Sequence, residues 1–140
     1  MAQTSEVLNE GIEEIIKLWS GGTATEMEYI VALNDTVACT AAKGSTYAAP
    51  VDPHHISGGL EEQAIDTVGT DTTNTTGDTI TFDHVLTATA SLNVTGIQVL
   101  NNSAGTPDKA FIECCFNAVL AMENTDSITI DGSSTIEQAA

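Results

Sequence analysis

The segment from Thr79 to Ala90 alternates apolar and polar residues more regularly than any other part of the chain. Successive side chains of a β-strand point to opposite faces of a sheet, so this period of two predicts a strand with one buried face. The expected buried face carries Ile80, Phe82, His84, Leu86, Ala88 and Ala90. A single strand leaves its backbone groups unpaired, so the chain must supply further strands.

Other segments have the spacing and the β-branched composition of strands. They are residues 28–33, 92–100, 111–122 and 126–131. Gly96 is expected to mark a bulge or a close approach of two strands, and residues 101–105 read as a hairpin loop. This order predicts a mainly β fold, an antiparallel β-sandwich or small barrel that follows an N-terminal helix. Aromatic residues make up only 4% of the chain, so we expect a thin core.

Residues 5–19 have apolar side chains at spacings of three and four, which indicates an amphipathic helix. The apolar stripe consists of Leu8, Ile12, Ile15, Ile16 and Trp19. Thr4 or Ser5 is suited to cap the helix start, and the glycine pair at 21–22 is suited to end it. Gly11 costs about 1 kcal/mol relative to alanine inside a helix, which suggests that it marks a close packing contact.

At 140 residues, the chain has the length of one domain. We expect a helix over residues 5–19 and a β-rich body over 27–131. Residues 38–71 contain glycines, prolines and little periodicity, so we expect a long irregular segment there, packed over one face of a sheet.

Acidic residues dominate the charge: 20 Asp and Glu face three Lys and no Arg, for a net charge of −17. Binding to nucleic acid or to an anionic membrane is therefore not expected, because both rely on cationic side chains. Such self-repulsion is screened more strongly in concentrated salt, which fits a halophilic setting. Ordinary solubility is the alternative reading.

The strongest metal-ligating combination in the sequence is His54 and His55 beside Asp52, since imidazole and carboxylate both bind divalent ions. Neighbouring histidines rarely reach the same ion without help from elsewhere, so an exposed loop is the favoured interpretation. No cofactor-binding fingerprint is present. We therefore expect neither a metal nor a cofactor.

An enzyme is not expected. A thiol of Cys114 or Cys115 paired with a histidine such as His84 is the only sequence basis for catalysis, and it would need a lowered thiol pKa. His84 lies on the apolar face of its predicted strand, and both cysteines lie within an apolar run. Together with Cys39 they are an odd number without CxxC spacing, so we expect buried apolar residues rather than a disulfide framework.

The N-terminus lacks the basic start and apolar block of a signal peptide, and no apolar run approaches the roughly 18 residues of a membrane span. From these two observations we expect a soluble chain that is not obviously exported.

Three segments in order carry a resemblance to a known family. Residues 27–34 (MEYIVALN) follow the helix and its glycines, residues 92–101 (LNVTGIQVLN) contain a V-x-G-I step, and residues 124–130 (NTDSITI) close the body. In this succession the chain resembles short structural proteins of tailed viruses of bacteria and archaea. Together with the acidity of the chain, the resemblance implies a virus of a halophilic host.

The resemblance implies a virion structural protein, most simply a capsid-decorating protein located in the virion. Its expected partners are copies of itself, in a small oligomer such as a trimer, and a major capsid or tail protein. The apolar helix stripe is the expected interface. A tail, neck or fibre-base component is the alternative within this class. A carbohydrate- or ion-binding β module is a further alternative, in which Trp19, Tyr29 or Tyr47 would stack on a sugar, although Trp19 is expected in the helix core.

Overall fold

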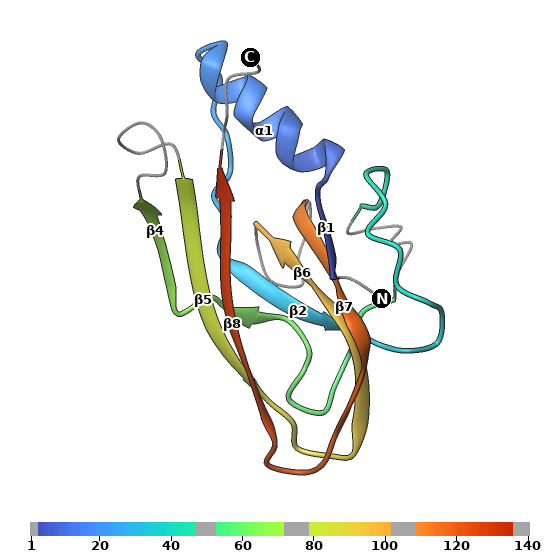
Figure 1. Ribbon diagram of the computed structural model, residues 1–140. Coiled ribbons are helices and arrows are strands. Elements are labelled where there is room, and N and C mark those ends of the chain that lie inside the picture. The colour runs from blue at the N-terminus through green and yellow to red at the C-terminus, as the bar shows by residue number, and fades with distance from the viewer. Residues whose placement is uncertain (1–2, 47–52, 72–78, 102–108, 136–140) are drawn as a thin grey trace.

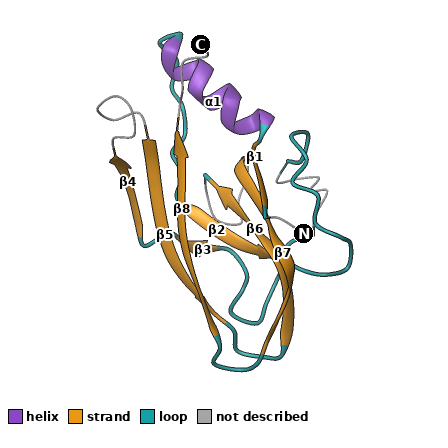
Figure 2. Ribbon diagram, viewed as in Figure 1, coloured by secondary structure: helices purple, strands orange, loops and turns teal. Residues whose placement is uncertain are grey.

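The computed structural model describes residues 3–46, 53–71, 79–101 and 109–135, and in them two antiparallel sheets and one helix (Figures 1 and 2). A five-stranded sheet has the order β1-β7-β6-β2-β3, and a three-stranded sheet has the order β4-β5-β8. The elements are β1 (Thr4–Val7), α1 (Asn9–Trp19), β2 (Tyr29–Leu33), β3 (Gln63–Ala64), β4 (Thr67–Asp71), β5 (Thr79–Thr87), β6 (Leu92–Leu100), β7 (Ala110–Met122) and β8 (Ser127–Thr135). The mainly β fold with an N-terminal helix is confirmed, as a sandwich of two separate sheets.

The larger sheet is built on the β6–β7 hairpin, which pairs from Leu92↔Met122 to Leu100↔Ala110. β2 lies on the other side of β6 and is buried on both faces beyond Tyr29. One face of β2 packs against the core. At the edge away from β6, the Ala32 amide donates a hydrogen bond to the Leu60 carbonyl at 3.0 Å, so the segment before β3 covers that edge. The predicted strand is confirmed, and its apolar sequence YIVAL agrees with burial of both faces.

Gly96 lies where the β6–β7 pairing shifts register, between Val94 and Gly96. A Cβ placed on Gly96 would lie 2.1 Å from the carbonyl oxygen of Cys114, which leaves room for glycine alone. The predicted bulge and close approach are both confirmed.

The smaller sheet is built on β5, which pairs along its whole length with β8, from Thr79↔Thr135 to Thr87↔Ser127. Its inner face is buried as predicted at Phe82, His84 and Leu86. The Phe82 ring lies over Gly132, where a Cβ would come within 2.2 Å of the ring. The glycine in β8 therefore makes room for one of the few aromatic side chains of the core.

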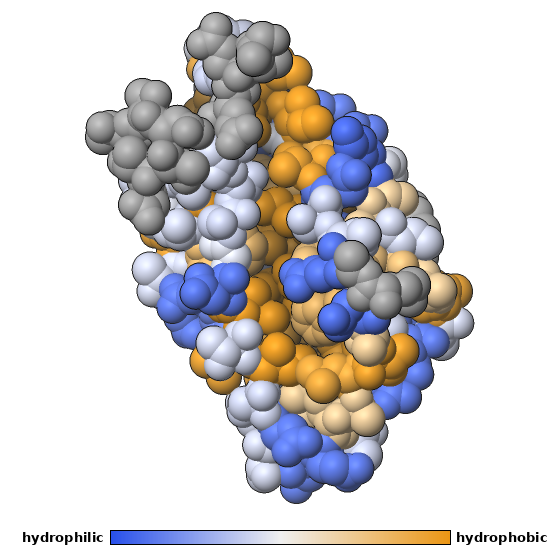
Figure 3. Space-filling model, in the orientation of Figure 1, coloured by the Kyte–Doolittle hydropathy of each residue, from blue (hydrophilic) through white to orange (hydrophobic). Residues whose placement is uncertain are grey.

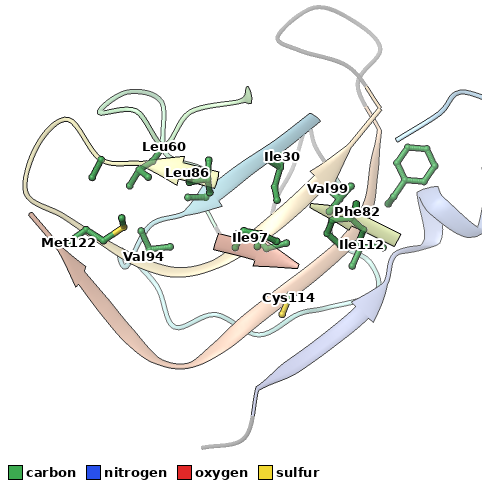
Figure 4. Close-up of a cluster of buried hydrophobic side chains, with 14 residues drawn as sticks. Ile30, Leu60, Phe82, Leu86, Val94, Ile97, Val99, Ile112, Cys114 and Met122 are labelled. Atoms are coloured by element: carbon green, nitrogen blue, oxygen red, sulfur yellow. The ribbon is translucent and has the colours of Figure 1, made fainter. Parts of the chain in front are cut away.

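The two sheets enclose one main core, in which Ile30, Val99 and Ile112 face Phe82 and Leu86 (Figure 4). At the bottom of Figure 1, the β5–β6 and β7–β8 connections lie against each other. There the Ala88 amide donates to the Asp126 carbonyl, and the Thr125 amide donates to the Ala88 carbonyl, both at 2.8 Å. The opposite end of the sandwich is covered by α1, which packs on β7 (Figure 1).

The start of the helix differs from the prediction. α1 begins at Asn9 with Leu8 at the N-cap position, and neither Thr4 nor Ser5 caps it, because both belong to strand β1. Ser, Thr and Val are poor helix formers, and here they gain backbone pairing with the edge of β7 instead.

The prediction that the glycine pair at residues 21–22 ends the helix is confirmed. Gly21 has a φ of +78°, its amide donates to the Leu18 carbonyl, and the Gly22 amide donates to the Lys17 carbonyl. This pair of bonds is a Schellman motif. Gly11 is also confirmed as a close contact, since a Cβ there would lie 2.8 Å from the carbonyl oxygen of Phe111 in β7.

Two predictions about the middle of the chain are wrong. Residues 38–71 are not irregular throughout, because they contain β3 and β4, which are too short to produce a clear sequence period. The cysteines are not all unpaired, because Cys39 and Cys115 form a disulfide across 76 residues of sequence. Only Cys114 remains reduced, and it is buried in the core as predicted.

Candidate functional site

One exposed side of α1 is apolar. Ile12, Ile16 and Trp19 are 40%, 56% and 75% exposed, and their spacing of four and three places them in one line along the helix. We call these three residues the apolar strip. Figure 3 shows hydrophobic surface at the top of the molecule, over α1, and continuing down between the two sheets. Exposed apolar side chains grouped in this way mark an interaction site more often than scattered ones do.

The buried side of α1 carries a carboxylate. Glu14 is only 2% exposed, and its oxygens accept hydrogen bonds from Lys17 Nζ at 2.5 Å, the Thr25 amide at 2.8 Å and the Thr25 hydroxyl at 3.2 Å. Burial by itself would raise the pKa of Glu14. The hydrogen bonds from Lys17 and Thr25 outweigh it and lower the pKa from 4.5 to about 2. Glu14 is therefore a firmly ionised anchor on the inner side of the helix.

Two other carboxylates of α1 contact the start of β7. The Ala110 amide donates to Glu10 Oε2 at 2.8 Å, and Lys109 Nζ lies 3.7 Å from Glu13 Oε2 and 3.6 Å from Glu14 Oε1. These polar contacts fix the rotation of the helix about its own axis. The acidic side is turned toward β7 and Thr25, and the apolar strip is consequently turned to solvent.

The five residues predicted as the interface are divided by the structure. Ile12, Ile16 and Trp19 form the exposed strip, and Trp19 is therefore not in the helix core as expected. Ile15 is half-buried and lines a cavity. Leu8 is fully buried in a small core cluster with Val31, Leu100 and Ala110, so its predicted place in an interface is wrong. It precedes the helix, where the chain turns inward from β1.

A cavity of about 380 Å³ lies beneath α1, between the helix and the open end of the sandwich. The helix contributes Ile15 and Leu18, β7 contributes Phe111 and Ile112, and the smaller sheet contributes Val68 and Ile80. Leu18 is 62% exposed, so the cavity opens to solvent at the helix, while Ile12, Ile16 and Trp19 do not line it.

A hydrogen-bond network of polar side chains crosses the larger sheet. Ser45 Oγ donates to Glu113 Oε2 at 3.0 Å, and Gln98 Nε2 donates to the same oxygen at 2.8 Å. Gln98 Oε1 then accepts from His54 Nε2 at 2.5 Å, which places a proton on that nitrogen. Burial lowers the pKa of His54, while the Gln98 hydrogen bond and the Glu62 charge partly oppose this. This network ties the connecting segments that contain Ser45 and His54 to the centre of the larger sheet.

The two adjacent histidines do not converge. His54 turns inward to Gln98, whereas His55 Nε2 lies 2.8 Å from the Asn93 carbonyl oxygen. Asp52, the third member of the predicted combination, lies outside the described residues. Across residues 3–46, 53–71, 79–101 and 109–135, no three His, Cys, Asp or Glu side chains are grouped to hold a metal ion.

The cysteines and His84 are not paired with one another. His84 is buried between Asp66 Oδ2 at 3.0 Å and Gln63 Oε1 at 3.2 Å. Gln3 Nε2 lies 3.0 Å from the Cys114 sulfur, and burial raises the pKa of that thiol, which makes it a poor nucleophile. Cys115 is held in the disulfide.

Comparison with protein-family models, curated proteins and solved structures finds no match to this chain. Among the described residues, no helix combines the length and the apolar content that crossing a membrane requires. Of the aromatic residues weighed for sugar stacking, Tyr29 is partly buried, Trp19 is exposed, and Tyr47 lies outside the described residues.

Replacing Glu14→Gln should lower the free energy of unfolding by about 2 kcal/mol near neutral pH, because Lys17 and Thr25 lose a charged acceptor. The folded-state pKa of Glu14 lies below its unfolded value, so the native protein keeps this contribution above pH 4.5 and loses it as the pH falls to about 2. The difference between the native protein and Glu14→Gln should therefore shrink across this window in urea unfolding at a series of pH values.

The matched control is Glu13→Gln, because the Glu13 side chain is on the same helix and mostly exposed. Its effect should stay within about 0.5 kcal/mol. An equal effect of the two variants, or a Glu14→Gln effect that is independent of pH, would contradict the anchoring role of Glu14.

Proposed function

We propose that this chain is a structural protein of a virion, a capsid-decorating subunit that associates with copies of itself through the apolar strip of α1. The observation that carries the proposal is the orientation of the helix. Its polar contacts with Thr25 and with residues 109–110 hold Ile12, Ile16 and Trp19 in solvent, although the opposite orientation would bury them.

The free energy gained by burying the apolar strip indicates how much of an association it can support. Burying the exposed parts of one Trp and two Ile contributes about 3–5 kcal/mol, and a pair of copies buries them twice, for about 6–10 kcal/mol. Association of two proteins costs about 4–15 kcal/mol in lost freedom of motion. The strip is therefore the anchor of a larger contact, and an exposed Trp is the residue type that most often fills this role.

A second copy of the chain is the partner proposed here. The strip contains no charged residue, and one straight helix presents it, so two copies can bury the same residues against each other about a symmetry axis. The remaining surface is strongly acidic in both copies, so their repulsion must be screened before the strips meet. A basic partner would instead bind best in dilute salt.

The disulfide between Cys39 and Cys115 supports a location on the outside of a particle. Disulfides persist in oxidising surroundings, including virion surfaces, and are rare inside cells. The resemblance of residues 27–34, 92–101 and 124–130 to segments of tailed-virus structural proteins is the sequence argument for the same assignment.

Self-association should increase when salt rises from about 0.15 M to about 1 M, because the screening length falls from about 8 Å to about 3 Å. Sedimentation velocity of the native protein measures this directly.

Ile16→Ser should weaken association by about tenfold, equivalent to about 1.4 kcal/mol. Val119→Ser is the matched control, because Val119 is 55% exposed but lies on β7, away from α1. A native protein that stays a single subunit in both salts, or equal effects of the two substitutions, would contradict self-association through the strip.

The location is tested by immunogold electron microscopy, with an antibody against this chain, on particles released from cells that carry its gene. Labelling spread over capsids is expected. Labelling confined to tails or necks would replace decoration with the tail alternative, and unlabelled particles would overturn the virion assignment.

A further inference from the structure

The cavity beneath α1 is a cleft that opens to solvent, since its lining includes Leu18 and Val68, which are 62% and 45% exposed. Clefts and cavities that bind small molecules measure about 300–1,000 Å³. At about 380 Å³, this cavity falls within the range of a binding pocket.

The cavity cannot close by moving the helix inward. Gly11 already touches the backbone of Phe111, where even one added carbon would clash. The hydrogen bond from the Thr25 amide to Glu14 ties the next helix turn to the segment that follows the helix. The helix therefore stays at a set height above the open end of the sandwich. The chain has few large side chains with which to fill the space below it.

The lining defines what the cavity can accept. Its walls are hydrocarbon from Val68, Ile80, Phe111 and Ile112, so an occupant gains by the removal of apolar surface from water. The polar lining includes Glu14 and the exposed Glu26, and the chain as a whole carries a charge of −17. An anionic head group would therefore be repelled.

We propose that this cavity is a binding site for an uncharged apolar small molecule. The site is separate from the self-association surface, because Ile12, Ile16 and Trp19 do not line the cavity. The proposal does not depend on the chain being a virion protein.

The test is a fluorescence titration of the native protein with the neutral probe N-phenyl-1-naphthylamine. Saturable binding with one probe per chain is expected. Val68→Trp fills the cavity and should weaken binding by about tenfold or more. Val85→Trp is the matched control, because both valines are 45% exposed in the smaller sheet but only Val68 lines the cavity. The control should bind like the native protein.

Two further measurements keep the result decisive even when Val68→Trp folds poorly. In the native protein, the probe should shift the methyl NMR signals of Ile80 and Ile112 and leave those of Val119 unchanged. The anionic probe 8-anilinonaphthalene-1-sulfonate should bind about tenfold more weakly than the neutral one. Absent saturation, equal binding by the two valine variants, or loss of binding in Trp19→Ser would overturn the cavity site. Equal binding of the two probes would overturn its preference for uncharged molecules.

Discussion

The ionised carboxylate of Glu14 determines how the helix sits on the rest of the molecule. A carboxylate removed from water is tolerated only with full hydrogen bonding, and Lys17 and Thr25 supply it. Lys17 belongs to the same helix and turns with Glu14, whereas Thr25 and Lys109 lie outside it, so a rotation that buried the apolar strip would take the carboxylate away from both. The same contact that holds α1 in place thus exposes Ile12, Ile16 and Trp19.

The cavity follows from the same constraint together with the composition of the chain. The sheets meet at one end, where the Ala88 hydrogen bonds join the two connections, and they diverge toward α1. Filling the wider end would take large side chains, and the core offers little beyond Phe82 and Phe111. A thin core was predicted from the scarcity of aromatic residues, and the space under the helix is its structural result.

The sequence predicted best those features that depend on local pattern. The strand at Thr79–Thr87 shows in its period of two, and the strand at Leu92–Leu100 shows in its β-branched composition. Gly11, Gly96 and the glycine pair after Ser20 each lie where a side chain would clash or a helix must end. The helix end follows from a steric rule that operates within a few residues, whereas Gly11 and Gly96 stand out because glycine is costly inside a helix or strand, although the residues they contact are distant in sequence.

Features that depend on distant partners were not predictable in this way. The bond between Cys39 and Cys115 and the strand β1 at the edge of β7 both join segments far apart in the chain. Glu14 looked like its solvent-facing neighbour Glu13, since nothing in the helix shows that Thr25 will fold back on it. Glu113 did carry a signal, because a lone acidic residue inside an apolar strand indicates a buried, hydrogen-bonded carboxyl group.

Trp19 is the single tryptophan of the chain, so its fluorescence reports directly on the exposure of the apolar strip. The emission and its quenching by acrylamide should be measured on the single subunit in dilute salt and again in concentrated salt. The orientation described here predicts a red-shifted, readily quenched signal for the single subunit, and a blue-shifted, protected one once copies associate. A blue-shifted and protected tryptophan in the single subunit would show that the strip is buried on its own sheets, and would contradict this account.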